Sequence, residues 1–236
     1  MKPIYVPKGA AREYGDYALN IYTGCPHQCF YCFAPSVLRK TKQTFYSCVE
    51  PRKNIIAELQ KQLESENIKD KLIHLCFTCD PYPRHHDNNI TREVIKLIKM
   101  SGNHVQILTK NADSIKRDFD LFNDKDWIGT TISCDNLNAE EFEPLASNPK
   151  ERIKMIKSAK NMGFNTWLSC EPVINPNTIY EILKCYSFFI DKINIGKLNY
   201  YPSQINWKEF GFEVERLCNE YGWNYYIKES LRAEMN

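Results

Sequence analysis

The sequence predicts an α/β protein, a partial (β/α)6 TIM-like barrel with a parallel sheet. Strand-like and helix-like segments alternate in one series from about residue 17, and such alternation favours parallel strands joined by helical crossovers. No Ser-, Gly- or Pro-rich linker, repeat or low-complexity segment interrupts the 236 residues. We therefore expect a single domain over residues 1–236, with an N-terminal extension (1–16), a β/α core (17–222) and a C-terminal segment (223–236).

The first half of the series contains three strands and three helices. Apolar and β-branched runs predict strands at 17–24, 71–77 and 104–109, and apolar residues at helical spacing predict helices at 55–66, 91–102 and 111–122. The helix at 91–102 is the clearest, because Thr91 suits an N-cap, Ile90 and Ile95 can pack across its entry, and Gly102 suits the C′ position. Asn111 is the expected cap of the next helix.

The second half repeats this pattern. Strands predicted at 127–133, 164–169 and 191–196 alternate with helices at 149–163, 176–189 and 207–221, where Gly163 ends the first helix and Pro176 begins the second. The segment WNYYI at 223–227 is a candidate for one more strand. A barrel of this kind carries its functional residues at the carboxyl ends of the strands.

Composition and charge exclude several classes of protein. The net charge of +2 argues against polybasic nucleic-acid binding, although not against a local basic groove. None of the nine glycines fits the spacing of a dinucleotide-binding turn or a P-loop. The sequence has no apolar run of the roughly 18 residues that a membrane helix needs, and no signal-peptide pattern at its start. We therefore expect a cytoplasmic monomer with no membrane partner.

The ten cysteines are the most unusual feature of the composition, and structural disulfides explain them poorly in a reducing compartment. Cys25, Cys29 and Cys32 form a C-x3-C-x2-C motif directly after the first predicted strand. Three thiolates in so short a loop can converge on one inorganic centre and leave one coordination position open. The alternatives are zinc, held with His27 or a distant residue, and cysteines packed as small hydrophobic side chains.

This motif, with an aromatic residue before its last cysteine and a place after the first strand of a β/α series, resembles the radical SAM superfamily. The resemblance implies a radical SAM core with a [4Fe-4S] cluster on Cys25, Cys29 and Cys32, and S-adenosyl-L-methionine on the open iron. It also implies that one electron from a small donor, such as flavodoxin or ferredoxin, cleaves this cofactor to methionine and a 5′-deoxyadenosyl radical that abstracts hydrogen from a substrate. The protein then binds, orients and shields the reactive group.

A closer resemblance, to the spore photoproduct lyase-like group, lies in four strand-end segments: Thr78-Cys79-Asp80-Pro81-Tyr82, Leu108-Thr109-Lys110, Ile132-Ser133 and Ser169-Cys170-Glu171-Pro172. It implies that Thr78 and Cys79 hold the amino group of the cofactor. Lys110 would face the cofactor carboxylate, and Ser133 would lie near the same end. Tyr31 would offer its backbone to the adenine. Glu171, which closes a strand, would contact a ribose or the substrate; plain capping or solvent exposure is the alternative for these side chains.

The sequence also departs from the lyase itself. That enzyme has a long segment ahead of its cysteine motif and a donor cysteine at the end of the second strand, where this sequence has Phe77. We therefore do not expect thymine-dimer repair. Cys79, Cys134 and Cys170 are candidate hydrogen donors, with packing or a second cluster as alternatives. Strand alternation predicts that Ser133 and Cys134 do not both face the barrel mouth.

The sequence thus predicts a radical SAM enzyme of open substrate identity, and a nucleobase-containing substrate (nucleotide or nucleic acid) is the first expectation. The alternatives are a radical SAM enzyme that acts on a small metabolite or peptide, and a zinc-stabilised binding module without catalysis. Two loops are further candidates for substrate contact, with solvated loop or aromatic packing as alternatives. They contain Arg39, Lys40, Lys42, Phe45 and Tyr46, and Tyr200, Tyr201 and Pro202.

Overall fold

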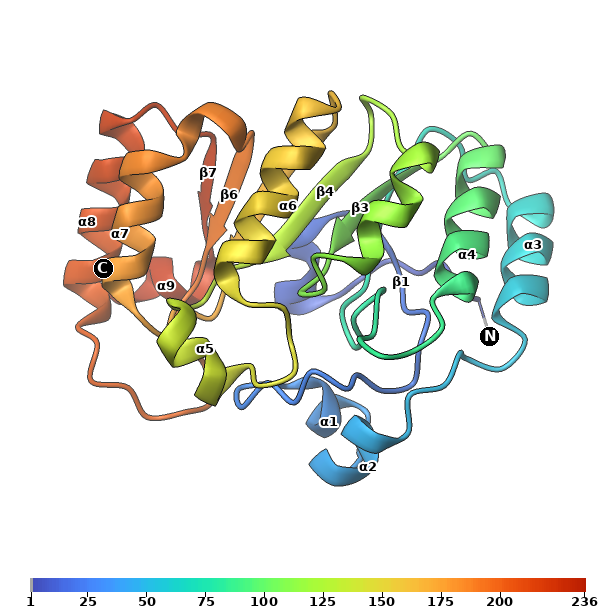
Figure 1. Cartoon of the computed structure of the whole chain (residues 1–236), viewed down its shortest axis with the longest axis horizontal. Helices are drawn as coiled ribbons and strands as arrows, with labels where there is room; N and C mark the ends of the chain where they lie inside the picture. Colours follow the sequence, from blue (N-terminus) through green and yellow to red (C-terminus); the bar gives the residue numbers. More distant parts are fainter. Residues whose placement is uncertain (1) are drawn as a thin grey trace.

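A sheet of seven parallel strands forms the centre of the protein (Figure 1). The structure is a computed structural model and describes residues 2–236. The strands lie side by side in sequence order and form a half-barrel, which confirms the predicted partial barrel. They are β1 (Tyr17–Leu19), β2 (Leu72–Leu75), β3 (His104–Leu108), β4 (Trp127–Thr131), β5 (Asn165–Cys170), β6 (Lys192–Ile195) and β7 (Tyr225–Ile227). The six predicted strands are confirmed, and β7 confirms the candidate strand at 223–227.

The two faces of the sheet differ in polarity, because successive side chains of a strand point to opposite sides. The outer face carries apolar side chains such as Ile73, Ile107 and Leu168, which are fully buried in the hydrophobic core. The inner face is polar and aromatic. His74 on β2 is in register with Gln106 on β3, and the inner residues of β5 and β6 follow the same pattern. The interior of the half-barrel is therefore polar while its outer wall is apolar.

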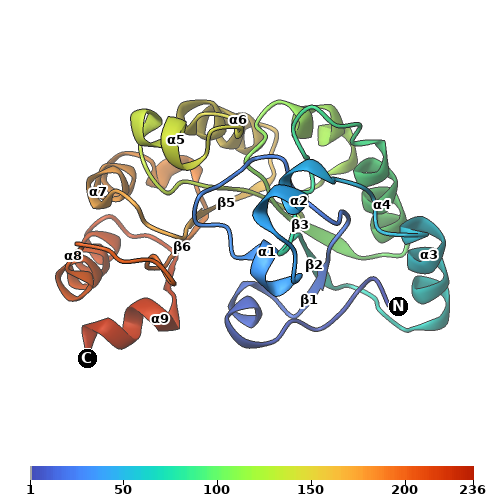
Figure 2. The same cartoon turned by 90° about the horizontal axis from the view of Figure 1, so that it is seen from below.

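Five helices cover the outer face and follow it as an arc (Figure 2). They are α3 (Ile55–Ser65), α4 (Asn89–Met100), α6 (Pro149–Asn161), α7 (Pro176–Cys185) and α8 (Trp207–Glu220), each within a predicted helical segment apart from the first residues of α4. Side-chain caps set the starts of the last three, α6, α7 and α8. Asn148 and Glu151 form a reciprocal capping box at α6, and Asn175 and Asn206 cap the other two long C-terminal helices.

Two predicted helix starts differ in the structure. Thr91 does not cap α4, which begins at Asn89; its buried hydroxyl donates to the carbonyl of Pro81 (2.5 Å) instead. The helix predicted at 111–122 is the 3-10 helix η2 (Ser114–Leu121). Asn111 still contributes near its start, since its side chain accepts a hydrogen bond from the backbone of Ser114 (3.3 Å). The Asp, Asn and Ser residues of this segment compete for backbone hydrogen bonds, which explains the shorter and tighter helix.

Six short elements were not predicted, because each is too short to show a periodicity. Three of them follow β1 and β4 at the carboxyl ends of the strands, below the sheet in Figure 1: α1 (Ala34–Val37), α2 (Lys42–Ser47) and α5 (Asn136–Phe142). The 3-10 helix η1 (Gly9–Tyr14) precedes β1 and lies on the open side of the half-barrel, dark blue in Figure 2. The others are α9 (Glu229–Arg232) and η4 (Ala233–Met235). The helix predicted at 176–189 ends earlier, as α7 at Cys185, and its last residues form the 3-10 helix η3 (Ser187–Phe189).

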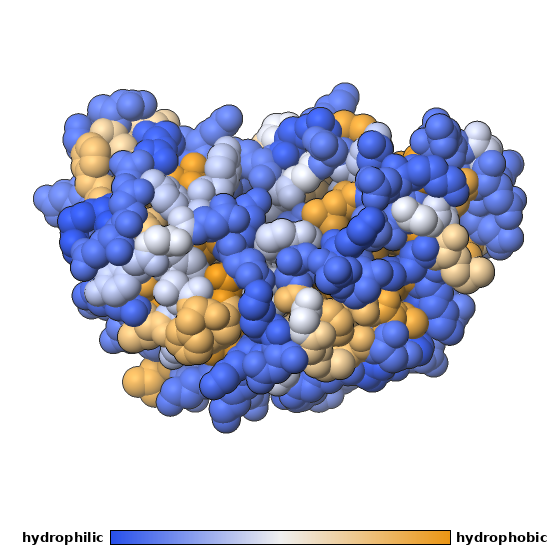
Figure 3. All heavy atoms as spheres, turned by 90° about the horizontal axis from the view of Figure 1, so that it is seen from above, coloured by the Kyte–Doolittle hydropathy of each residue, from blue (hydrophilic) through white to orange (hydrophobic). Residues whose placement is uncertain are grey.

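The end of the half-barrel opposite α1, α2 and α5 is mainly hydrophilic, with separate hydrophobic patches (Figure 3). Among residues 2–236, no helix combines the length and the hydrophobicity that a membrane span requires. The unpredicted elements at the carboxyl ends of the strands are therefore the features that shape a functional site.

Candidate functional site

The loop that carries Cys25, Cys29 and Cys32 is held from outside by α2. The backbone N–H of Cys25 donates to the carbonyl of Phe45 (3.2 Å), and the hydroxyl of Tyr46 donates to the carbonyl of Cys29 (3.0 Å). Gly24 makes this close approach feasible, because a Cβ at that position would collide with the carbonyl of Phe45. The three cysteines are thus presented on a loop that α2 fixes at the mouth of the half-barrel.

The three thiols are sheltered from water, and Cys29 is buried. Burial, followed by the nearby Asp80 carboxylate, raises the pKa of Cys25 well above its usual value. Burial also raises the pKa of Cys29 to about 12, against the opposing effect of the Lys110 ammonium. Thiolates would therefore form here only when an electrophilic centre replaces the protons.

His27 lies in the cysteine loop and is the candidate fourth ligand of the zinc alternative. His27 is buried, its Nδ1 lies 3.4 Å from an oxygen of Asp80, and its Nε2 accepts from the backbone N–H of Arg84 (3.3 Å). Both ring nitrogens are therefore occupied by protein partners. Within residues 2–236, no three His, Cys, Asp or Glu side chains come close enough to share one metal ion. A tetrahedral zinc needs its ligands at about 2.0–2.3 Å, so His27 would have to leave both of its partners to become one of them.

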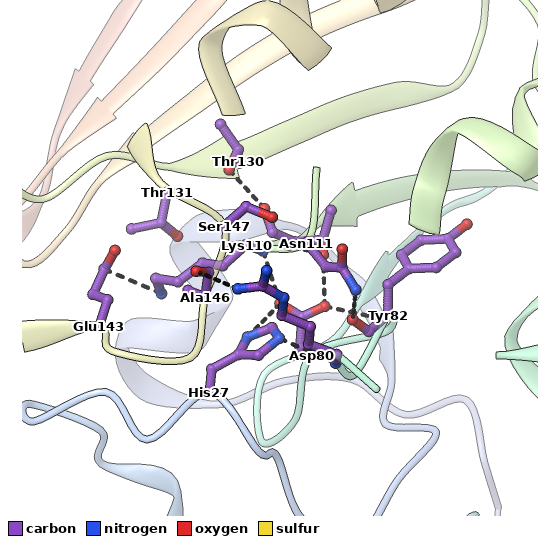
Figure 4. Close-up of polar contacts among 12 residues, drawn as sticks. His27, Asp80, Tyr82, Lys110, Asn111, Thr130, Thr131, Glu143, Ala146 and Ser147 are labelled. Carbon is purple, nitrogen blue, oxygen red and sulfur yellow. Dashed lines mark hydrogen bonds and ion pairs between the residues drawn. The ribbon is translucent and has the colours of Figure 1, made fainter. Parts of the chain in front are cut away.

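Asp80 joins three parts of the site (Figure 4). One carboxylate oxygen accepts from the hydroxyl of Thr109 (2.6 Å) and the backbone of Tyr82 (2.8 Å), and the other accepts from the backbone N–H of Lys110 (2.8 Å). The second oxygen also faces His27 of the cysteine loop. This buried acid therefore locks the ends of β2 and β3 to the cysteine loop and sets the position of Lys110.

Glu143 is the centre of a second buried network that no sequence motif indicated. Its carboxylate accepts hydrogen bonds from the Tyr31 hydroxyl and the Arg152 guanidinium. One of its oxygens lies 3.9 Å from Nζ of Lys110 (Figure 4). The Tyr31 hydroxyl also lies 3.1 Å from Oγ of Ser133. Burial alone would raise the pKa of Glu143, but the charges of Arg152 and Lys110 and the two hydrogen bonds lower it.

Three predicted site residues, Tyr31, Lys110 and Ser133, thus come together around Glu143. The Lys110 ammonium also lies 5.4 Å from the centre of the Tyr31 ring. Burial tends to lower the pKa of Lys110, yet the neighbouring Cys29 and Glu143 raise it, so the ammonium is kept. The cysteine loop therefore has a fixed positive charge beside it.

Thr78 and Cys79 lie apart from that group, on the loop after β2. The side chain of Asn20 accepts from the backbone of Thr78 (2.8 Å), and Arg52 donates to the Thr78 hydroxyl (3.4 Å). The sulfur of Cys79 accepts from the backbone N–H of Tyr22 (3.4 Å). Burial would raise the pKa of Cys79, but hydrogen bonds, first from the Cys76 thiol and then from the backbone, lower it. The pKa of Cys79 is therefore lowered, whereas burial raises the pKa values of Cys29 and Cys76.

Glu171 belongs to a third group, inside the open side of the half-barrel. The hydroxyl of Tyr14 on η1 donates to Glu171 (2.6 Å) and lies 2.9 Å from Oγ of Ser169. The buried ammonium of Lys228 lies 3.1 Å from Glu171 and 2.8 Å from Glu13. The N-terminal segment thus fills the interior beside β5 and holds Glu171 in place.

The candidate donor cysteines also occupy different places. β4 ends at Thr131, so Ser133 and Cys134 lie beyond the strand and the expected alternation does not apply to them. Burial, followed by the charge of Glu143, raises the pKa of Cys134 to about 12, which places this thiol near the second network. Cys170 shares the outer face of β5 with Leu168 and packs in the core near Cys218 of α8. The structure therefore does not bring Cys170 to the mouth.

Comparison with solved structures identifies the fold. Spore photoproduct lyase complexed with dinucleoside spore photoproduct aligns with a TM-score of 0.69 over 94% of this chain and 79% of that chain, at 14% identity. Streptococcus suis SuiB bound to precursor peptide SuiA aligns with a TM-score of 0.64 over 92% of this chain and 50% of that chain, at 14% identity. The chain has the same half-barrel fold as these two proteins. Its likeness to the lyase confirms the resemblance that the strand-end segments predicted.

Sequence comparison finds distant relatives. The chain is 26% identical to the uncharacterised protein ORF301 of Acidianus two-tailed virus over 75% of this chain and 62% of that protein. It is 26% identical to an uncharacterised protein of Methanocaldococcus jannaschii over 67% of this chain and 60% of that protein. The chain thus spans about 60% of the length of these two curated relatives, and no protein-family model matches it.

Within this half-barrel fold, the structure adds residues that sequence reasoning missed. Glu143, Arg152, Tyr14 and Lys228 are the buried charged and polar groups that hold the predicted residues in place. Glu143 and Arg152 look like ordinary surface residues in the sequence. For Tyr14, the one signal in the sequence is the mixture of polar and aromatic residues at 10–17 (AAREYGDY), which differs from the composition of a solvated tail. The pairing of these groups depends on tertiary contacts between distant segments.

Proposed function

We propose that this protein is a radical SAM enzyme, in which Cys25, Cys29 and Cys32 hold a [4Fe-4S] cluster that binds S-adenosyl-L-methionine. The observation that carries the proposal is the three-cysteine loop at the carboxyl end of the first strand of a radical SAM half-barrel. Likeness in fold supports the proposal, and the chemistry of the site residues supports it independently.

The residues present fit a cluster of this kind. Three thiols on one loop supply three ligands and leave one iron open. α2 covers the outer side of the loop, and the Lys110 ammonium favours the thiolate form of Cys29 against the effect of burial. The ligands need not converge on one ion, because each binds a different iron. When bound, the cluster and its cofactor would supply a 5′-deoxyadenosyl radical by one-electron cleavage.

The remaining residues would bind and orient the cofactor. Lys110, fixed by Asp80 and kept charged, would hold the cofactor carboxylate, with Ser133 beside it. Thr78 and Cys79 would hold the amino group from the loop after β2, and the backbone of Tyr31 would face the adenine. Glu171 would contact a ribose or the substrate from β5. We keep Cys79 and Cys134 as the candidate hydrogen donors. Cys170 is left out, because it lies on the outer face of β5.

The substrate that we propose first is nucleobase-containing. The likeness to a lyase complexed with a dinucleoside supports it, and the likeness to SuiB bound to a precursor peptide keeps a peptide as the second candidate. Salt-sensitive binding of oligonucleotides by the reconstituted protein would favour the first substrate class. Salt-independent binding of a peptide or metabolite would favour the second.

The proposal is tested by anaerobic reconstitution with iron and sulfide, followed by reduction in the presence of S-adenosyl-L-methionine. We expect a [4Fe-4S] cluster and release of 5′-deoxyadenosine. The variant Cys29→Ala should not bind the cluster. Cys134→Ser is its control, because it removes a buried thiol outside the cysteine loop, and it should still bind the cluster. Stoichiometric zinc without cleavage of the cofactor would contradict the proposal and restore the binding-module alternative.

A further inference from the structure

The loop after β2 carries a second pair of closely spaced cysteines, Cys76 and Cys79. Their spacing is C-x2-C, the arrangement in which two thiols of one turn lie close enough to react with each other. Both cysteines are free thiols in the structure. The pair lies outside the three-cysteine loop, and the proposed function uses only Cys79 of the two.

The turn between the two cysteines is held by one side chain. The side-chain oxygen of Asn20 accepts hydrogen bonds from the backbone N–H groups of Phe77 and Thr78, both at 2.8 Å. Across this turn, the Cys76 thiol donates a hydrogen bond to the sulfur of Cys79. The two sulfur atoms are therefore direct neighbours, which is the first requirement for a disulfide.

The surroundings of Cys79 stabilise a thiolate. Its sulfur accepts a hydrogen bond from the backbone N–H of Tyr22 (3.4 Å). The Arg52 guanidinium donates to the hydroxyl of Thr78 (3.4 Å), the residue before Cys79. Burial would raise the pKa of Cys79, but the hydrogen bonds and the charge of Arg52 lower it. N–H donors and a nearby cation are typical of reactive cysteines.

The two thiols of the pair are unequal. Cys76 is 5% exposed, and burial, followed by its hydrogen bond to Cys79, raises its pKa well above the usual value. Cys79 is only half-buried. A redox-active pair needs an outer thiolate that attacks an incoming disulfide and an inner thiol that displaces the product. Cys79 and Cys76 have these two sets of properties.

Other uses of the pair are less well supported. Two thiols do not complete a metal site, and within residues 2–236 no group of three His, Cys, Asp or Glu side chains could hold a metal ion. Packing as small hydrophobic side chains accounts for the burial of Cys76. It does not account for the donors that converge on the sulfur of Cys79.

We infer that Cys76 and Cys79 form a thiol–disulfide exchange site for low-molecular-weight disulfides such as oxidised glutathione. The Cys79 thiolate attacks one sulfur of the small disulfide, so that a mixed disulfide forms on Cys79 and one glutathione thiolate leaves. Cys76 then gives its proton to solvent and attacks the sulfur of Cys79, which forms the Cys76–Cys79 disulfide and releases the second glutathione. Overall, the two thiols give up two electrons and two protons, and the small disulfide becomes two thiols.

The inference goes beyond the proposed function and holds whether or not the three-cysteine loop binds a cluster. Its test incubates the full chain, as wild type, Cys76→Ser and Cys79→Ser, with glutathione at several ratios of oxidised to reduced form. The reaction is stopped with acid, free thiols are alkylated, and tryptic peptides are weighed by mass spectrometry. The peptide of residues 72–84 contains both cysteines of the pair and no other cysteine. Exposed Cys185, on the peptide of residues 185–192, is the internal control for reaction with glutathione.

We expect the wild-type peptide 72–84 to lose two hydrogen atoms at oxidising ratios and to regain them in excess reduced glutathione. Cys76→Ser should retain glutathione on Cys79, because no second thiol displaces it. Cys79→Ser should gain glutathione on Cys76 at least about tenfold more slowly, since one pKa unit changes the thiolate fraction about tenfold.

Two results in the wild type would overturn the inference. One is a fully reduced peptide 72–84 in a chain that carries glutathione on Cys185. The other is a disulfide that joins this peptide to the three-cysteine loop instead of joining Cys76 to Cys79. Equal rates of glutathione uptake in Cys76→Ser and Cys79→Ser would contradict the assignment of Cys79 as the attacking thiol.

Discussion

The buried ion pair of Glu143 and Arg152 gives the most specific stability prediction. Both side chains are fully buried. In Glu143→Gln the shape is kept, and the Arg152 guanidinium keeps its bonds to the carbonyls of Ser147 (2.6 Å) and Thr131 (2.8 Å), but a neutral amide oxygen replaces its counter-ion. Removing one partner of a buried pair costs about 3–5 kcal/mol. For a chain of this size we expect the melting temperature to fall by about 6–20 °C.

The assay is urea and thermal unfolding of the wild type, Glu143→Gln and the control Glu140→Gln. Glu140 is exposed on α5, so its variant should lie within about 0.5 kcal/mol of the wild type. Replacing both partners, by Glu143→Leu with Arg152→Met, should recover only part of the loss, because the Arg152 charge is gone but Lys110 and the Tyr31 hydroxyl still lose the carboxylate. A loss below about 1 kcal/mol in Glu143→Gln would refute this reasoning.

The contribution of this ion pair to the free energy of unfolding depends on pH. The folded-state pKa of Glu143 is lowered, so its stabilisation is fully present above the unfolded pKa of about 4.3 and is lost as the pH falls through the folded value. The stabilities of the wild type and Glu143→Gln should therefore converge in acid. A difference that stays constant down to strongly acidic pH would mean that the charge of Glu143 is not the cause.

Three further predictions concern the interior of the half-barrel. Gly129→Ala would push a Cβ into the Trp167 indole and should lower the free energy of unfolding in urea by about 1–3 kcal/mol. Gly15→Ala is the control, because its new Cβ lies 3.7 Å from the nearest neighbour. Equal losses of unfolding free energy in the two variants would contradict the packing argument. Tyr14→Phe removes the hydroxyl that donates to a carboxylate and should lower the unfolding free energy by about 1–3 kcal/mol; an unchanged urea midpoint would disprove that role. Burial lowers the pKa of His74 to about 3, so its contribution is present above pH ~6.5 and falls by about 1.4 kcal/mol per pH unit below it. His74→Phe should flatten that slope between pH 6.5 and 5, and an unchanged slope would mean that His74 is protonated in the folded state.

The strand order could be predicted because each strand and helix leaves a local pattern. β2 and α4 show it clearly, as an apolar run and as an amphipathic helix that stops just before Gly102. The three-cysteine loop was predictable for the same reason, since its chemistry is encoded within eight residues (25–32) of the sequence. The short helices α1, α2 and α5 were not, because one or two turns show no periodicity. These helices determine what surrounds the cysteines.

The residues that support the site needed the three-dimensional structure. Glu140, Glu141 and Glu143 look alike in the sequence, and only the fold buries Glu143 against Arg152. Cys170 is a different case, because the alternation of side chains along a strand indicates its place. Side chains alternate along β5, so placing Ser169 on the inner face puts Cys170 on the outer face. Its place in the core could have been predicted from that alternation.

The most direct test of the central claim is the iron and sulfide content of the anaerobically reconstituted chain, measured beside Cys29→Ala. The account predicts about four irons and four sulfides per wild-type chain, release of 5′-deoxyadenosine on reduction, and loss of both properties in the variant. Zinc bound stoichiometrically without cleavage of the cofactor would contradict the account. Retained cleavage in Cys29→Ala would contradict the assignment of the cluster to Cys25, Cys29 and Cys32.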